Sequence, residues 1–272
     1  MHQVLRSLLT RISNDLRKEF RKARKKAYDS RAFYLLVCGF SGLLINGNDL
    51  TVNTHYKVQK LTEKLRIDAN WDKPQWQSVE AMSIRCLLGD KPKFIPNTQA
   101  KLLYDDNNLY VIFCVCDHYV KAVAQETQGP VWEDSCVEFF FSPQNASPLP
   151  YFNLEINCGG TALMHYNRVP RQDVSPLETT EVERIEIASA LPKIVNPEID
   201  TATTWTIEYR MPLAILTKFP SYTHPRPAVT WHANFFKCGD KTSNPHWLTW
   251  SPITNDTLDF HQPQFFGTLV FE

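Results

Sequence analysis

Apolar and polar residues alternate in several short runs of this 272-residue chain, and this period of two limits the folds that it can adopt. In residues 151–157, for example, Phe152, Leu154 and Ile156 are separated by Asn153 and Glu155. Side chains of a β-strand point alternately to its two faces, so such runs predict strands with one apolar face. The strands expected on this basis span residues 100–104, 109–116, 136–141, 151–157, 161–166, 184–188, 204–211, 230–238 and 267–271.

Turn residues separate these runs. Residues 105–108, Asp-Asp-Asn-Asn, predict a hairpin, and Gly159-Gly160 predicts a second turn. A short helix is expected only at residues 212–218, and long helices do not alternate with the strands. The pattern therefore favours an all-β protein, an antiparallel sandwich of two sheets, over an α/β fold.

The alternation also assigns residues to the two faces of the strands. Burial of an aromatic or aliphatic side chain contributes roughly 1.5–3 kcal/mol, so the apolar face should set the register. We expect these residues in the core: Phe152, Leu154, Ile156, Trp205, Ile207 and Tyr209. If the strands share one sheet, its other face carries these polar residues: Glu138, Asn153, Glu155, Asn157, Glu208, Arg210 and Asn234. That face is either an ordinary solvated surface or a binding surface, and its amides, which form strands poorly, favour the second interpretation.

Tryptophan is concentrated beside these polar residues. Trp132 comes six residues before Glu138, and the last 42 residues hold Trp231, Trp247 and Trp250. A flat aromatic ring stacks on the apolar C–H face of a pyranose while amides and carboxylates bind its hydroxyls. The combination predicts a sugar-binding surface.

Charge is distributed unevenly along the chain. Residues 1–31 hold 10 of the 29 Lys and Arg but 3 of the 29 Asp and Glu, so their net charge is +7 and that of residues 32–272 is −7. A nucleic-acid-binding domain usually carries a basic field, so nucleic acid is excluded as the expected partner.

The N-terminal 55 residues are expected to be a separate leader, followed by one domain over residues 56–272. Residues 32–45 are uncharged and mostly apolar, and a basic run precedes them. This order is typical of an export signal, although a membrane-associated anchor and a start codon assigned too far upstream are alternatives. We expect an exported protein, periplasmic, at the cell surface or secreted, or a cytoplasmic one if the start is mis-assigned. Any membrane association would involve residues 1–45 only.

Seven scattered cysteines argue against a disulfide framework. Cys114, Cys116 and His118 share one face of a predicted strand, but their spacing is unlike a zinc site, and we expect them to pack in the core. A looser set, His232, Cys238 and His246, is more typical of hydrogen-bonding side chains. No phosphate-binding loop, zinc-protease helix or nucleophile elbow is present.

Several of these motifs, in this order, resemble the family 9 carbohydrate-binding modules. They include Trp132 with Glu138 and the strand of residues 151–157. They also include residues 205–212, Ala233-Asn-Phe and Phe266-Gly267, and the similarity begins at residues 67–76. The resemblance implies an immunoglobulin-like or jelly-roll sandwich, related to DOMON domains, that binds sugars without catalysis.

The resemblance also implies roles for individual residues. Trp132 matches the first stacking tryptophan, and Glu138 matches the carboxylate that binds hydroxyls. Asn153, Glu155 and Asn157 lie on the strand that supplies further polar ligands, and Asn234 matches the amide before the second aromatic residue. The chain departs from the family at Lys237, where that aromatic is expected. Either Trp247 closes the site instead, or the site is open. No cofactor is expected, and the structural calcium of some family members finds no clear Asp-rich loop here.

The expected function is binding of glycan chains or chain ends, such as xylan or β-glucan, in support of polysaccharide breakdown, with a separate glycosidase as a further partner. One alternative is a xylanase-type glycoside hydrolase, which needs two carboxylates across the sugar, for instance Glu138 with Glu155 or Asp134 with Asp259. Another is a DOMON-like haem or interaction domain, with Met164 and His165 as axial ligands. Hydroxyl-binding carboxylates are far commoner than catalytic pairs, so an enzyme is not the favoured interpretation.

Overall fold

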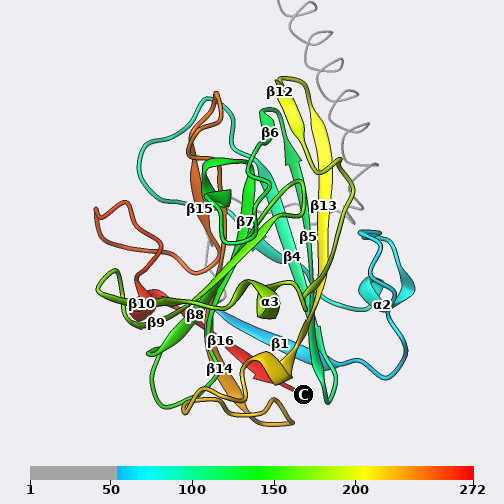
Figure 1. Ribbon diagram of the computed structural model, residues 1–272, viewed down its shortest axis with the longest axis vertical. Coiled ribbons are helices and arrows are strands. Elements are labelled where there is room, and N and C mark those ends of the chain that lie inside the picture. The colour runs from blue at the N-terminus through cyan, green and yellow to red at the C-terminus, as the bar shows by residue number, and fades with distance from the viewer. Residues whose placement is uncertain (1–53) are drawn as a thin grey trace, which may run out of the picture. The chain divides into compact units, whose positions relative to one another are not determined.

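The computed structural model describes residues 54–272, which form an antiparallel β-sandwich of two sheets. Figure 1 shows β4, β5 and β13 side by side and the last strand, β16, next to β1. The predicted all-β sandwich is therefore confirmed. Residues 1–53 of the predicted leader, with its export signal or anchor, lie outside the described residues. Within residues 54–272 no helix is long and apolar enough to cross a membrane.

The first sheet has the strand order β10-β9-β8-β7-β14-β16, and β15 and β3 continue it beside β14. Its strands are β3 (Cys86–Leu87), β7 (Cys136–Ser142), β8 (Tyr151–Asn157), β9 (Ala162–Val169), β10 (Asp173–Pro176), β14 (Thr230–Cys238), β15 (Trp247–Thr249) and β16 (Gly267–Phe271).

The second sheet has the order β4-β5-β13-β11, and β2 pairs with β4 on the side away from β5. Its strands are β2 (Met82–Ile84), β4 (Asn97–Tyr104), β5 (Asn108–Asp117), β11 (Glu186–Ser189) and β13 (Thr203–Pro212). The remaining elements are β6 (Val120–Ala122) paired with β12 (Val195–Ile199), α2 (Pro74–Gln77), α3 (Thr179–Val182), η1 (Val131–Glu133), η2 (Leu213–Ile215) and η3 (Pro263–Phe265).

Strand β1 (His55–Lys60) joins the two sheets, and the sequence pattern did not predict it. Its first residues pair with β16 and its last two, Gln59 and Lys60, pair with β4. Both pairings are parallel, whereas the other pairings among residues 54–272 are antiparallel. The pattern missed this strand because only Tyr56 and Val58 are buried in it.

Local turn chemistry explains both hairpins that the sequence predicts. Between β4 and β5, the Asp105 carboxylate accepts hydrogen bonds from the backbone N–H groups of Asn107 and Asn108, both at 2.7 Å. Between β8 and β9, Gly160 has a φ of 87°, a conformation that glycine adopts without steric cost. The Asp105 hydrogen bonds stabilise the first turn, where the backbone N–H groups have no partner in the strand ladder.

The inner faces of the two sheets enclose the main hydrophobic core. All six residues predicted for it are at most 1% exposed, and the register of β7, β8 and β13 follows from their burial. The rings of Phe139 and Phe235 stack at a centroid distance of 4.6 Å, which is a favourable geometry for aromatic pairs. Trp231, one of the three tryptophans near the C-terminus, is fully buried here, and Trp250 packs edge-on against Phe235.

The outer face of the first sheet is also covered, so the solvated surface that was one interpretation of its polar residues is wrong. Glu138, Asn153 and Glu155 are 3%, 1% and 5% exposed. Over them, η1 and the segment before β16 contribute Val131 and Phe260 to a second hydrophobic cluster. These polar side chains therefore lie in a low-dielectric environment, where a hydrogen bond is stronger and an unpaired polar or charged group is more costly than in water.

Two of the polar residues assigned to this face lie elsewhere. Glu208 and Arg210 belong to β13, which pairs with β5 in the second sheet. Arg210 forms an exposed ion pair of 2.7 Å with Glu186. Alternation assigns a residue to a face of its strand but does not say to which sheet the strand belongs, and this explains the error.

Two further expectations need correction. Cys114, Cys116 and His118 are half-buried at outward positions, because Val115 and Asp117 are the residues of this end of β5 that face the core. The expected helix at residues 212–218 is only η2, which is followed by a turn. Its single 3₁₀ turn is typical of a connector.

Candidate functional site

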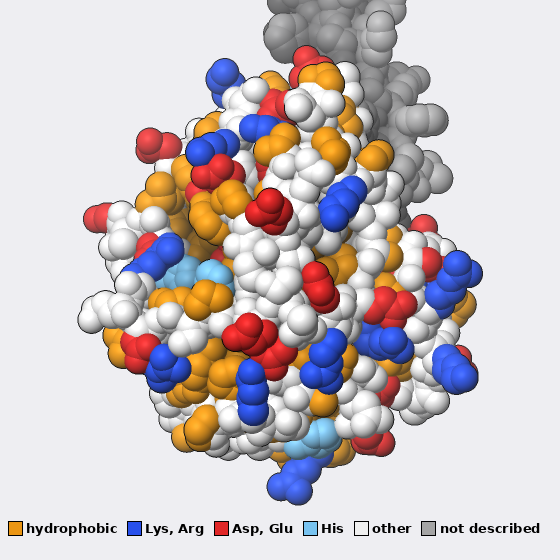
Figure 2. All heavy atoms as spheres, viewed as in Figure 1, with side chains coloured by type: hydrophobic (Ala, Val, Ile, Leu, Met, Phe, Trp, Pro, Cys, Tyr) orange, Lys and Arg blue, Asp and Glu red, His pale blue; other side chains and the backbone are white. Residues whose placement is uncertain are grey.

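A cleft of about 240 Å³ opens on the outer face of the first sheet. Its floor is formed by β7, β8 and β9, and its walls come from η1, β15 and the loops after β9, β14 and β15. Figure 2 shows histidine side chains at a hollow bordered by hydrophobic side chains on this side of the molecule. Five of the seven predicted site residues line the cleft: Trp132, Glu138, Asn153, Glu155 and Trp247.

The polar floor follows from the pairing of β7 with β8. Glu138 lies opposite Glu155, and Phe140 lies opposite Asn153, so the four side chains form a square on one face. The Asn153 amide donates to Glu155 Oε1 at 2.8 Å, and the Asn167 amide donates to Asn153 Oδ1 at 2.6 Å. A flat aromatic ring thus lies beside a carboxyl pair whose orientation the two amides help to fix.

Burial decides the protonation of this floor. It raises the pKa of Glu138 well above its usual value, and the nearby Cys238 and Glu155 raise it further. Burial also raises the pKa of Glu155 to about 7, although the Asn153 hydrogen bond and the positive charge of Arg171 oppose the shift. Near neutral pH Glu155 is therefore partly protonated and burial favours the neutral form of Glu138, and a neutral carboxyl group can donate as well as accept hydrogen bonds.

The two tryptophans of the cleft are connected through Asp240. The Trp247 indole N–H donates to Asp240 Oδ1 at 2.8 Å, and the Asp240 backbone N–H donates to the Trp132 carbonyl at 3.3 Å. Trp132 is 39% exposed, which is unusual for so large an apolar side chain. Its ring is therefore accessible for stacking.

The opposite wall combines an ion pair with apolar side chains. Arg171 and Asp259 form an ion pair of 2.6 Å, which links the β9–β10 turn to the loop before η3. Next to them, the Tyr151 hydroxyl lies 2.6 Å from His261 Nδ1. Burial lowers the pKa of His261 to about 3, so this imidazole is neutral. Sequence reasoning named Asp259 only in a possible catalytic pair with Asp134 and missed the others as site residues, because they come from three separate segments that no local motif joins.

Apolar side chains form the rim. Val174 and Leu258 line the cleft and are 37% and 50% exposed. Together with Trp132 they make three exposed large hydrophobic residues around one opening. Exposed apolar groups that cluster in this way are typical of a binding site.

Comparison with known proteins decides the family. The profile of carbohydrate-binding family 9 matches residues 72–271, about three quarters of the chain. The chain belongs to carbohydrate-binding family 9. No curated protein matches it significantly.

Solved structures share this family 9 fold. A proposed carbohydrate-binding protein from Bacteroides uniformis is 27% identical, with a TM-score of 0.72, over 80% of this chain and 99% of that one. A family 9 module from Caldicellulosiruptor kristjanssonii in complex with cellotriose is 16% identical, with a TM-score of 0.56, over 80% of this chain and 93% of that one. The structure of a family 9 module from the same organism with glucose is 15% identical, with a TM-score of 0.55 and coverages of 80% and 95%.

The family resemblance placed the second aromatic residue at Lys237, but this side chain points away from the cleft. It is fully buried, lies 3.3 Å from Asp117 Oδ2 and donates to His246 Nε2 at 2.7 Å. Trp247 instead lies opposite Cys238 in the ladder of β14 and β15 and lines the cleft. The sequence left open whether Trp247 or no second aromatic residue reaches the site, and in the structure Trp247 lies at the cleft.

Asn157 and Asn234 do not line the cleft, contrary to the sugar-binding roles that the family resemblance implies for them. The Asn157 amide oxygen accepts from Thr161 N at 2.9 Å and holds the β8–β9 turn. The Asn234 side chain exchanges two hydrogen bonds of 2.9 Å with the backbone of Ser251. The hydrogen-bonding groups of the Asn234 amide are therefore used by the backbone that follows β15, whereas the family pattern would offer them to a ligand.

The residues of the other suggested sites are also separated. Asp134 is fully buried, and its Oδ2 accepts from the backbone N–H groups of Val123 and Ala124, so it does not face Asp259 in the cleft. Met164 packs in the main core, whereas His165 lines the cleft on the other face of β9. They cannot be the two axial ligands of one haem.

The looser metal set is divided among different partners. His232 Nε2 lies 3.2 Å from the Asn145 carbonyl, and His246 contacts Lys237 on the inner side of the sheet. Cys238 contacts Glu138 on the outer side. The expectation that these histidines are satisfied by hydrogen bonds agrees with this arrangement.

Proposed function

We propose that this family 9 chain binds saccharides without cleaving them, in the cleft on the outer face of the first sheet. The observation that carries the proposal is the meeting of Trp132 and Trp247 with a floor of buried carboxyl and amide groups. A sugar ring offers an apolar C–H face and several hydroxyls, and this combination matches both. Support also comes from the two family 9 structures in complex with cellotriose and glucose.

Each lining residue has a role in this proposal. Trp132, which is accessible, and Trp247 stack on sugar rings, and the indole of Trp247 is oriented by Asp240. Glu138, Asn153 and Glu155 bind hydroxyls. Neutral carboxyl groups suit a neutral ligand, because desolvation of a charged floor would oppose binding.

The ligand class that we propose is a glycan chain or chain end such as β-glucan or xylan. The binding of such polymers would support their breakdown by a separate glycosidase. Because these polymers lie outside the cell, we also propose that the protein is exported through its N-terminal leader. Cell fractionation of the native host checks this localisation.

A glycan array with the full chain identifies the ligand, and calorimetry then compares variants. Trp132→Ala should weaken binding by roughly 30-fold or more, since a central tryptophan contact is worth about 2 kcal/mol or more. Trp247→Ala should act in the same direction. Trp71→Ala is the matched control, because Trp71 is half-buried, contacts Lys101 and lies outside the cleft.

Unchanged affinity in Trp132→Ala, with the control also unchanged, would contradict the proposed site. Loss of the folded state in Trp132→Ala would show that this tryptophan is structural. Products released from the bound glycan, and lost in Glu138→Gln and Glu155→Gln, would favour the hydrolase alternative, which the adjacency of these two carboxyl groups keeps open.

A further inference from the structure

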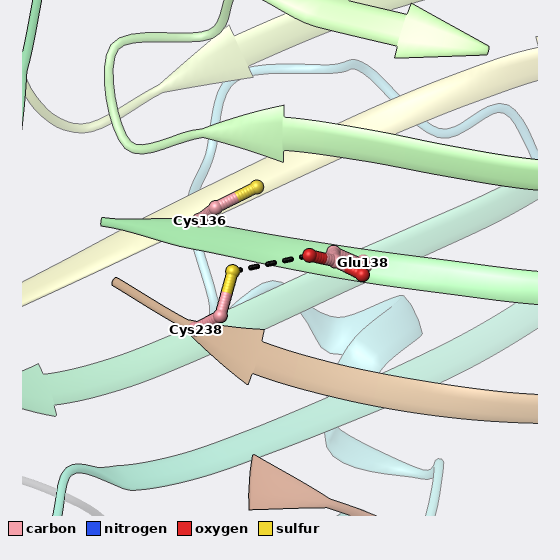
Figure 3. A group of neighbouring side chains, drawn as sticks. All are labelled: Cys136, Glu138 and Cys238. Atoms are coloured by element: carbon pink, nitrogen blue, oxygen red, sulfur yellow. Dashed lines mark hydrogen bonds between the residues drawn. The ribbon is translucent and has the colours of Figure 1, made fainter. Parts of the chain in front are cut away.

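Two cysteines and one glutamate meet at one end of the cleft floor. Cys136 and Cys238 are directly opposed on β7 and β14, and Glu138 follows Cys136 by two residues, so all three side chains share the outer face. The two sulfur atoms and a carboxylate oxygen lie within 4.8 Å of one another. Figure 3 shows the Cys238 sulfur directed at Glu138, and the Sγ–Oε1 distance is 3.1 Å.

This cluster is enclosed but not isolated from solvent. Cys136, Cys238 and Glu138 are 0%, 1% and 3% exposed. Glu138 and Cys238 nevertheless line the cleft, which gives a small ion a path to them. Among residues 54–272, no Lys, Arg or His forms an ion pair with Glu138.

We propose that Cys136, Glu138 and Cys238 bind a thiophilic divalent cation, with Zn²⁺ as the best match. Two thiolates and a carboxylate form a donor set that Zn²⁺ accepts at about 2.3 Å for sulfur and about 2.0–2.2 Å for oxygen. In a tetrahedral site such donors lie roughly 3.7 Å apart, so the observed cluster needs shifts of no more than about 1 Å. The fourth position faces the cleft and takes a water molecule or a ligand hydroxyl.

Cation binding at this position is coupled to proton release. Zn²⁺ displaces the protons of the two thiols and the carboxyl, and its two positive charges offset two of the three negative charges that then form. The main rival is a disulfide, because cysteines that are directly opposed on antiparallel strands lie near bonding range. A disulfide would consume both sulfur donors, so the two states exclude one another.

The test uses the reduced full-length protein and Co²⁺ as a spectroscopic probe for Zn²⁺. Titration should produce a sulfur-to-cobalt charge-transfer band that saturates at one ion per chain and is displaced by Zn²⁺. Cys136→Ser and Cys238→Ser should each abolish the band. Cys158→Ser is the matched control, since Cys158 is also buried but contacts the Lys121 carbonyl away from the cluster.

Glu138→Gln keeps the size of the side chain and tests the third ligand even if a serine variant fails to fold. It should weaken Zn²⁺ binding by more than the roughly 10–100-fold that loss of an outer-shell partner costs. Absence of the band in reduced protein, its survival in both serine variants, or a Cys136–Cys238 disulfide that resists mild reduction would each overturn the proposal. Because no sugar is present, the outcome is independent of the proposed function.

Discussion

Glu208 in the second sheet and Glu138 in the first are both buried glutamates, but they differ in how many hydrogen bonds the protein itself makes to them. Glu208 accepts from Lys73 Nζ at 2.6 Å, from Trp76 Nε1 at 2.8 Å and from the Ala69 backbone N–H at 2.8 Å. Glu138 has one close side-chain contact, with Cys238, and otherwise faces the cleft. A carboxylate whose bonds are satisfied within the fold stabilises it, whereas one with unused hydrogen-bonding capacity is available to a ligand.

The largest expected change in stability comes from replacing Glu208, the carboxylate whose hydrogen bonds are satisfied within the fold. Glu208→Gln places an amide N–H₂ among donors and leaves Lys73 buried without its main partner. Removal of one member of a buried ion pair costs about 3–5 kcal/mol, so the free energy of unfolding in urea should fall by that amount. Glu186→Gln, at an exposed pair with Arg210, should cost no more than about 1 kcal/mol. Equal effects of the two variants would contradict the assigned role of Glu208.

Glu155 in the cleft should make the stability of the fold depend on pH. The pKa of Glu155 is raised to about 7, so its contribution is favourable below pH 4.5 and is lost as the pH rises toward 7. Glu155→Gln removes this loss and should raise stability relative to the wild type by at most about 3 kcal/mol near pH 8. Thermal midpoints of both proteins at pH 4.5, 6 and 8 measure the difference. A difference that does not grow with pH would show that Glu155 is ionised in the folded protein.

Glu138→Gln makes the same substitution as Glu208→Gln in the first sheet, and its expected effects are smaller. In protein freed of metal ions, the neutral amide should not destabilise the fold at pH 7, because burial already favours the neutral form of Glu138, in contrast to the effect of Glu208→Gln. It should weaken saccharide binding about fivefold, since one hydrogen bond is worth roughly 1 kcal/mol and the amide still accepts. Calorimetry and urea unfolding of the same samples check both parts. Strong destabilisation with unchanged sugar affinity would make Glu138 a structural residue.

The smallest effect is expected from removal of residues 1–50. The first described strand, β1, begins at His55, so the sandwich should keep its strands and its cooperative thermal transition. A calorimetric scan of the shortened protein tests this separation. Loss of the transition would show that the leader belongs to the folded domain.

Local patterns predicted nine of the strands, the hairpin at residues 105–108 and the core residues, because alternation and turn chemistry act over a few positions. The predicted strands are β4, β5, β7, β8, β9, β11, β13, β14 and β16. They did not predict that β13 joins the other sheet or that β1 pairs with β16, because pairing depends on contacts distant in sequence. For the same reason the cleft was only partly foreseen. Trp132 and Glu138 belong to one short motif, whereas Arg171 and His261 reach the cleft from separate loops. The hydrogen bond between the Asn234 amide and the Ser251 carbonyl could not be read from either local segment.

A crystal structure of the protein with the tightest glycan from the array tests the central claim most directly. The proposed function predicts a sugar ring against the Trp132 indole, with a hydroxyl within hydrogen-bond distance of Glu138 or Glu155. Density for the glycan on any other surface, with the cleft residues unchanged and without contact to it, would contradict the assignment of this cleft as the saccharide site.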